Sequence, residues 1–236
     1  MSAAIFVPGH SVVRMSDGTF RPSGIYQDII YADPSRPFPF RRTGVWNPNC
    51  DPDATTSYLG GGEVVVGAAV LLYRQLEAAG KRVTLYMVGG RSDYLESIAA
   101  DQAELSEATV MESMARGLLG KQASIRTINH TRTTEDDIHA IMDTVERCGC
   151  EQAFVVMMTF RLPRAEVILQ KLIINNPAVE QTASRTVFAS AEAYLPDVPS
   201  YQRMWSSTAY ARTAENERVG MRKILLGQSG TTGGKT

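Results

Sequence analysis

Two histidines and one glutamate stand where they could carry protons. His10 and His130 each follow an apolar run of strand length, and an imidazole there acts as a general acid or base near neutral pH. Glu107 opens a segment with helical spacing and is the third candidate catalytic residue. A hydrogen-bonded loop residue is the alternative for each histidine. The chain has no HExxH or GxSxG string, so these residues form a candidate proton-transfer set without a recognised catalytic motif.

Arginines gather at similar places along the chain. Arg91, Arg161 and Arg164 follow apolar runs, as does Arg132, in a protein whose formal net charge is -1. The planar guanidinium group matches the geometry of phosphate and carboxylate. A solvated surface role is the alternative for each arginine taken singly. Together they predict locally concentrated positive charge and an anionic or zwitterionic small-molecule ligand.

Glycines stand beside several of these residues. Gly9, Gly89 and Gly90 follow apolar runs, while Gly61 and Gly62 open the first helical segment. Glycine lets a ligand approach the main chain closely, and the N–H groups at a helix start attract anions. A tight turn is the alternative, because the chain lacks the GxGxxG spacing of a dinucleotide-binding loop.

Hydroxyl and acidic residues complete the predicted ligand set. Thr134 and Glu135 lie at a predicted helix start, and Thr159 follows a predicted strand. Caps and helix electrostatics favour such residues in first turns without any function. Carboxylates at these helix starts would repel phosphate, which leaves Glu107 or Glu135 for ribose hydroxyls, amines or proton transfer.

Alternating strands and helices must position these residues. Apolar runs predict strands, and segments with apolar residues at helical spacing predict helices between them. The predicted strands are 3–7, 82–88, 124–128, 153–158 and 185–189, and the predicted helices are 64–76, 107–119, 134–147 and 163–174. This order predicts the α/β class, a Rossmann-like open sheet of about five mainly parallel strands with helices on both faces, plus a C-terminal helix. Ligands of such sheets bind beyond the carboxyl ends of the strands, where all the candidate residues fall.

The domain prediction is one Rossmann-like unit over residues 1–226. Within it, 10–58 is a long insertion or lid and 200–226 is the C-terminal helix, while 227–236 is a flexible tail. The 24 basic and 25 acidic residues give no basic surplus, so we expect no nucleic-acid partner. The three cysteines match neither a disulfide framework nor a metal site. Because the chain shows neither a signal sequence nor an apolar stretch of membrane length, we expect a cytoplasmic protein without a membrane span.

Six short strings occur in order over residues 3–172: AIFVPGH, GGGE, VGGRS, LSEATVM, HTRTTEDD and MTFRLPRA. Their order resembles the YdcF-like family, which includes the SanA and ElyC proteins. The resemblance implies a Rossmann-type fold, and S-adenosylmethionine binding is associated with one member while cell-envelope processes are associated with others. Two positions depart from the family pattern. Arg161 stands ahead of the Pro163–Ala165 segment where the family commonly has histidine, and aspartate stands for asparagine in the acidic segment 134–137.

Three functions are compatible with these observations. The first is a binder of, or transferase for, a nucleotide-like ligand such as S-adenosylmethionine. The second is a hydrolase or phosphatase for a phosphorylated or envelope-precursor substrate, with His10, His130 or Glu107 handling protons. The third is a non-catalytic binding protein. The substrate and the oligomeric state stay open.

Overall fold

The structure is a computed structural model that describes residues 1–10, 12–24, 26–32, 40–42, 53, 57–195 and 199–227. At its centre lies a five-stranded sheet in the order β10-β9-β1-β7-β8, in which every pairing is parallel. The strands are β1 (Ser2–Val7), β7 (Arg82–Val88), β8 (Ile125–Ile128), β9 (Gln152–Met157) and β10 (Thr186–Ser190). The predicted α/β Rossmann-like class is confirmed, and each of these strands begins and ends within one residue of its predicted bounds.

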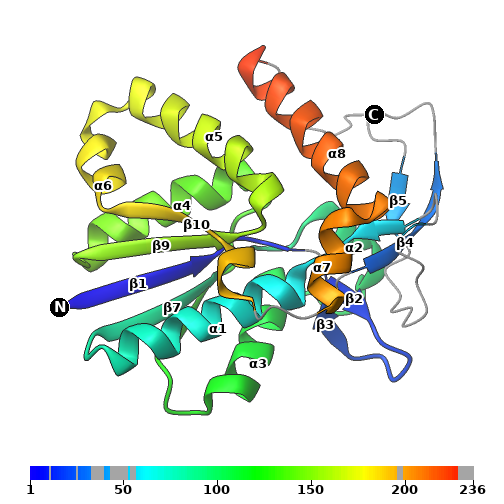
Figure 1. The fold of residues 1–236 in the computed structure, drawn as a ribbon, viewed down its shortest axis with the longest axis horizontal. Coiled ribbons are helices and arrows are strands. Elements are labelled where there is room, and N and C mark those ends of the chain that lie inside the picture. The colour runs from blue at the N-terminus through cyan, green and yellow to red at the C-terminus, as the bar shows by residue number, and fades with distance from the viewer. Residues whose placement is uncertain are drawn as a thin grey trace.

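Helices cover both faces of this sheet (Figure 1). They are α1 (Gly62–Ala78) and α3 (Glu107–Leu119) on one face, and α4 (Thr134–Cys148) and α5 (Leu162–Asn175) on the other. Successive side chains of a strand point to opposite faces, so β1 is apolar on both sides. Ile5 and Val7 pack in the core with α1 and α3, while Phe6 packs in the core with α4 and α5. The buried ring of Phe6 also stacks on Tyr86 of β7, with ring centroids 4.8 Å apart.

The direction in which strands are added reverses at β1. The chain goes from β1 to β7 and β8 on one side, and then α4 carries it back to β9 on the other side of β1. In open parallel sheets the crevice at such a switch point, beyond the carboxyl ends of the strands, is where ligands bind. The fold therefore singles out the space between the ends of β1 and β9.

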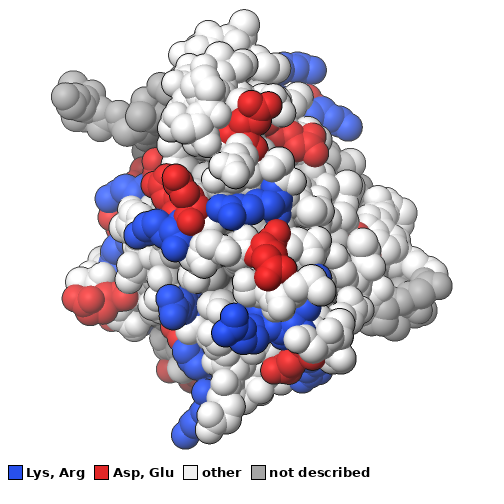
Figure 2. All heavy atoms as spheres, turned by 90° about the vertical axis from the view of Figure 1, so that its left-hand side faces the viewer, with Lys and Arg blue, Asp and Glu red and all other residues white. Residues whose placement is uncertain are grey.

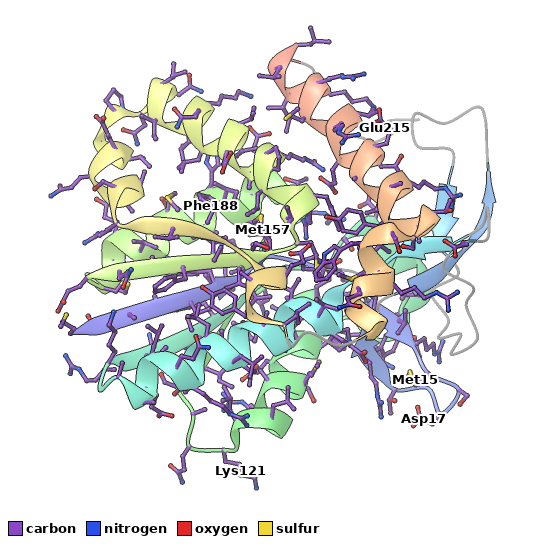
Figure 3. The ribbon with its side chains drawn as sticks, in the orientation of Figure 1. Met15, Asp17, Lys121, Met157, Phe188 and Glu215 are labelled. Atoms are coloured by element: carbon purple, nitrogen blue, oxygen red, sulfur yellow. The ribbon has the colours of Figure 1, made fainter. Side chains whose placement is uncertain are left out.

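The insertion between β1 and α1 contains short antiparallel strands. A hairpin joins β2 (Val12–Arg14) to β3 (Phe20–Pro22), and a second sheet has the order β5-β4-β6, with β4 (Tyr26–Ala32), β5 (Phe40–Arg42) and β6 (Ser57–Leu59). Met15 and Asp17 lie at the outer end of the hairpin (Figure 3). Residues 11, 25, 33–39, 43–52 and 54–56 of the predicted lid lie outside the described residues, so the lid stays a prediction.

The predicted C-terminal helix is present, but the range 200–226 is not one continuous helix. It is divided into α7 (Pro199–Ser206) and α8 (Thr208–Leu225), with Ser207 between them. The Ser207 side chain accepts a hydrogen bond from the Tyr210 N–H and so caps α8. A serine in extended backbone conformation starts a new helix because its hydroxyl replaces an acceptor of the preceding turn. Of the predicted tail, residues 228–236 lie outside the described residues.

Shorter helices connect the main elements: α2 (Asp93–Ile98), α6 (Glu180–Ser184) and the 3₁₀ turns η1 (Thr159–Arg161), η2 (Pro177–Val179) and η3 (Ala191–Tyr194). Within the described part of the chain, every helix is too short or too polar to cross a membrane. Figure 2 views the side where β1 begins, opposite the carboxyl ends of the strands. Basic and acidic side chains are interspersed on this face.

Candidate functional site

Glycines allow the loops after β1, β7 and β8 to pack against one another. A Cβ on Gly90 would lie 2.1 Å from the Thr131 carbonyl oxygen, and one on Gly89 would lie 2.9 Å from the Gly9 Cα. Gly89 also has φ +141°, a backbone conformation that side chains rarely adopt. Gly89 and Gly90 accept hydrogen bonds from the N–H groups of Ala108 and Glu107, so the same loop holds the start of α3. Tight packing therefore accounts for these two glycines without a ligand.

Gly9 brings two carboxyl groups to one point. A Cβ on Gly9 would lie 2.6 Å from Glu107 Oε2 and 3.4 Å from Asp137 Oδ2. The Gly9 N–H donates to Asp137 Oδ2 over 3.1 Å, and Glu107 Oε1 accepts from the Ser92 hydroxyl over 2.7 Å. The acidic first turns of α3 and α4 thus converge on the loop after the central strand. Any ligand that reached Gly9 would meet carboxylate oxygens.

Asp137 is the more enclosed of the two, with only 4% of its surface exposed. Burial raises the pKa of its carboxyl above the ordinary range, because the charged form loses hydration. The Thr131 hydroxyl, the positive charge of Arg161 and the Gly9 N–H oppose that rise in pKa. Although the Thr131 hydroxyl is close enough to act on this pKa, it makes no hydrogen bond of good geometry within the described structure. Asp137 therefore holds a proton more readily than a surface aspartate.

Arg161 joins the ends of β9 and β1 across the switch point. Its Nη1 donates to the Gly9 carbonyl oxygen over 2.8 Å and lies 3.1 Å from His10 Nε2. Its Nη2 donates to the Thr134 hydroxyl over 3.3 Å at the start of α4. His10 is only 5% exposed, so the imidazole is enclosed beside the guanidinium. We call Gly9, His10, Glu107, Asp137 and Arg161 the switch-point cluster.

Gly61 and Gly62 do not offer free N–H groups to an anion. The Gly61 N–H donates to the Gly24 carbonyl, and the Gly62 N–H donates to the Ser23 hydroxyl over 3.2 Å. A Cβ on Gly60 would lie 2.5 Å from that same hydroxyl oxygen, and Gly61 has φ +75°. These contacts match the tight-turn alternative, in which the glycines let the segment after β3 close over the start of α1.

The other predicted arginines have protein partners away from the switch-point cluster. Arg91 donates to the carbonyl oxygens of Ala99, Gln102 and Leu105 and so ties together the segment between α2 and α3. Arg132 pairs with Asp93 over 2.9 Å and with Glu96 over 3.0 Å, both on α2. Arg164 pairs with Glu217 of α8 over 3.2 Å. Of these four arginines, Arg161 is the one whose contacts bring it to Gly9.

Of the remaining predicted residues, one contacts the switch-point cluster and three lie elsewhere. Thr134 belongs with the switch-point cluster through Arg161, whereas His130 is exposed on the loop after β8. Glu135 pairs with Lys171 of α5 over 3.5 Å. The Thr159 N–H donates to both carboxylate oxygens of Glu192, and its hydroxyl lies 2.8 Å from the Ser190 hydroxyl. Thr159 thus belongs to a separate polar group at the ends of β9 and β10.

Sequence reasoning passed over Asp137 and Ser92 as site residues. Asp137 precedes Ile141 and Val145 at a spacing of four along α4, and all three are buried. An acidic residue in line with the apolar face of a helix is a detectable signal of a buried carboxyl. Ser92 carries no comparable signal, because its contact with Glu107 depends on how the loop after β7 folds back over α3.

Comparison with known proteins adds no functional information: no family model, no curated protein and no solved structure matches the chain. The resemblance to the YdcF-like family therefore stays a prediction. Within the described residues, no group of three or more histidine, cysteine, aspartate or glutamate side chains is arranged to hold a metal ion. The side chains of the switch-point cluster can accept hydrogen bonds from hydroxyl or ammonium groups, donate through Arg161 and exchange protons through carboxyl or imidazole.

Proposed function

We propose that the switch-point cluster binds a small nucleoside-like ligand that carries hydroxyl groups and a positive charge. The observation that carries this proposal is the convergence of the Glu107 and Asp137 carboxyl groups on Gly9. S-adenosylmethionine is the first candidate, because the resemblance to the YdcF-like family implies it. The activity proposed for the site is group transfer from that ligand to a second substrate.

The charges at the site support this ligand class over a phosphate-rich one. Carboxylate oxygens accept hydrogen bonds from ribose hydroxyls and ammonium groups, and they repel phosphate. Arg91, Arg132 and Arg164 have partners elsewhere, so of the four predicted arginines Arg161 is the one that faces the Glu107 and Asp137 carboxyl groups. A zwitterion or cation suits this balance better than a di- or triphosphate.

Isothermal titration calorimetry on the full chain tests the proposal with three ligands: S-adenosylmethionine, adenosine and ATP. We expect the first two to bind with a Kd below about 1 mM, which corresponds to roughly 4 kcal/mol of binding free energy, and ATP to bind more weakly. Glu107→Gln should weaken the binding of S-adenosylmethionine at least about tenfold, since a hydrogen bond to a charged group contributes roughly 1.5–3 kcal/mol.

Glu104→Gln is the matched control, because Glu104 is an exposed carboxylate just before α3. It should leave the Kd unchanged. Tighter binding of ATP than of S-adenosylmethionine would overturn the proposal. So would a Glu107→Gln protein that keeps its thermal midpoint and binds S-adenosylmethionine as before.

A hydrolase is the second candidate, and the enclosed imidazole of His10 beside Arg161 favours it. In this case the guanidinium would hold an anionic substrate while His10 or Glu107 moved the proton. A screen with phosphomonoester and phosphodiester substrates separates the two candidates. Activity that survived in a His10→Ala, Glu107→Ala double variant would exclude these roles. A folded protein that bound one of these ligands and had no activity would favour the third function, non-catalytic binding.

A further inference from the structure

A cavity of about 260 Å³ lies between the start of α5 and helix α8. Five of its lining residues fall on one face of α8, at positions i, i+4, i+7, i+8 and i+11 along the helix. Its walls are formed by Thr159, Phe160, Pro163, Arg164, Tyr210, Ala214, Glu217, Arg218 and Met221. None of these residues belongs to the switch-point cluster, so the cavity is a separate feature of the same edge.

The single turn η1 connects this cavity to the cluster. Thr159 and Phe160 line the cavity, and the next residue, Arg161, contacts Gly9 and His10. The cavity wall and the Arg161 side chain of the cluster are therefore carried by consecutive residues of one turn. The volume is below the roughly 300–1,000 Å³ of pockets that enclose a whole small-molecule ligand. The cavity thus suits one group of a larger ligand.

One part of the wall is apolar and aromatic. The rings of Phe160 and Tyr210 meet edge to face, with centroids 5.4 Å apart, and Pro163, Ala214 and Met221 extend this surface. Burial, and next the nearby charge of Glu192, raise the pKa of the Tyr210 hydroxyl. Such a surface packs well against a planar ring.

The rest of the wall offers donors and acceptors whose charges are balanced. Arg164 pairs with Glu217 over 3.2 Å, and Arg218 pairs over 3.0 Å with Glu215, which Figure 3 labels on α8. Because each guanidinium has an acidic partner, the cavity has little net charge with which to attract phosphate. Spare N–H groups of arginine and a carboxylate oxygen can instead bond the edge of a heteroaromatic ring.

We infer that this cavity holds the planar base of a nucleoside-like ligand, whose remaining polar part extends to the switch-point cluster. The inference rests on the proposed function for the position of that polar part. An aromatic wall beside mixed hydrogen-bonding groups is how proteins recognise unstacked bases: the ring stacks, and its edge is hydrogen-bonded. A purely aliphatic group would leave the arginine and glutamate edge unused.

The experiment fills the cavity from α8 with the variant Ala214→Leu. The matched control is Ala211→Leu, because Ala211 lies on the exposed side of the same helix. Calorimetry with adenosine and with S-adenosylmethionine should show at least about tenfold weaker binding for Ala214→Leu, equal to roughly 1.4 kcal/mol. The control should stay within about twofold of the unmodified chain, since it changes no residue of the cavity.

A second measurement does not depend on a variant. In the NMR spectrum of the unmodified chain, signals of the Ala214 methyl and the Tyr210 ring should shift on addition of adenosine. Signals of the Ala211 methyl should not. If Ala214 and Tyr210 signals stay in place while adenosine binds, the inference is overturned.

The outcomes also separate this inference from the proposed function. If Glu107→Gln weakens the binding of S-adenosylmethionine and Ala214→Leu does not, the cluster binds the ligand and the cavity does not hold its base. If adenosine binding depends on Ala214 but no ligand responds to Glu107→Gln, the cavity stands and the proposed role of the cluster fails. If neither adenosine nor S-adenosylmethionine binds, both fail.

Discussion

The start of α1 and the starts of α3 and α4 lie at the same edge of the sheet but use their residues differently. At α1, the first N–H groups donate to Ser23 and Gly24, and Gly61 lies against Met158, just after β9. At α3 and α4, Ser106 and Thr133 cap the helices with their own side chains. The caps leave the following carboxyl groups, those of Glu107 and Asp137, turned towards Gly9.

The difference separates two kinds of helix start at this edge of the sheet. A helix start whose N–H groups are covered by another segment has no capacity left for an anion, whatever its glycine content. A helix start capped from within satisfies its main chain and still presents a first-turn side chain. In this protein, the glycines allow close packing, and the first-turn carboxyl groups of α3 and α4 are the candidates for chemistry under the proposed function.

The strongest test of this comparison is Gly90→Ala, which asks whether the loop after β7 is held by packing. A Cβ at this position would overlap the carbonyl oxygens of Asn129 and Thr131, which are main-chain atoms and cannot rotate away. We expect the free energy of unfolding to fall by about 3 kcal/mol, at the upper end of overpacking effects. Urea unfolding followed by circular dichroism measures this change.

The control for that variant is Gly117→Ala on the exposed surface of α3, where a Cβ would meet no atom within 4 Å. Alanine there should raise the free energy of unfolding by roughly 0.5–1 kcal/mol, because it favours the helix. Equal effects of the two variants would show that Gly90 is not needed for packing.

Arg91→Met is expected to have the next largest effect. The variant removes donors to the Ala99, Gln102 and Leu105 carbonyls but keeps a long apolar side chain. The free energy of unfolding should fall by about 2 kcal/mol, since partly buried carbonyls lose a charged donor. Binding of S-adenosylmethionine should not change in the protein that remains folded.

The control is Arg74→Met, which removes a single exposed bond to the Leu118 carbonyl and should change stability by less than about 0.5 kcal/mol. If the Arg91→Met protein were stable but lost affinity for S-adenosylmethionine, Arg91 would contribute to ligand binding, as the sequence predicted.

Much of the fold was predictable from local signals. Apolar runs predicted the strands. Ser106 marks the start of α3 because its side chain caps the helix, and Gly149 marks the end of α4 because it adopts a left-handed backbone conformation. The division of the C-terminal helix at Ser207 was missed, because helical spacing continues on both sides of the break.

The edge of the sheet at which the candidate residues lie was predictable, but which of them contact one another was not. Arg161 and Gly9 are 152 residues apart in the chain, and Asp137 and Gly9 are 128 apart. Four arginines after predicted strands looked equivalent, yet their partners are set by how distant loops fold together. Periodicity places a residue at an edge, whereas its hydrogen-bond partners depend on tertiary structure.

Ser23→Ala sharpens the comparison from the α1 side. Ser23 is fully buried, and its hydroxyl accepts the Gly62 N–H at the start of the helix. Loss of this acceptor should lower the free energy of unfolding by about 1 kcal/mol, as for other helix caps. Ligand affinity should be unchanged. The exposed Ser113→Ala on α3 serves as the control, and an equal loss in both variants would contradict a capping role for Ser23.

The smallest effect is expected from Glu63→Gln, and it appears as a change in pH dependence. Burial raises the pKa of this half-buried carboxyl in the first turn of α1, although the charge of Arg21 opposes the rise. A folded-state pKa above the unfolded one means that the folded chain binds the proton more tightly. Stability from this group is therefore lost as pH rises through the range just above an ordinary glutamate pKa, and none is lost below that range.

Glu63→Gln should remove that loss, so the variant should gain stability relative to the unmodified chain between about pH 4 and pH 7. The gain should be less than about 0.5 kcal/mol, because water reaches half of the group and screens it. Urea unfolding across this range measures it, with the exposed Glu77→Gln on the same helix as the control. A variant that became less stable as pH rose would mean that the Glu63 carboxylate is stabilised at the α1 start by the helix N–H groups. In that case the N–H groups at the α1 start would still interact with an anionic side chain, even though they donate to Ser23 and Gly24. The contrast drawn with α3 and α4 would then be wrong.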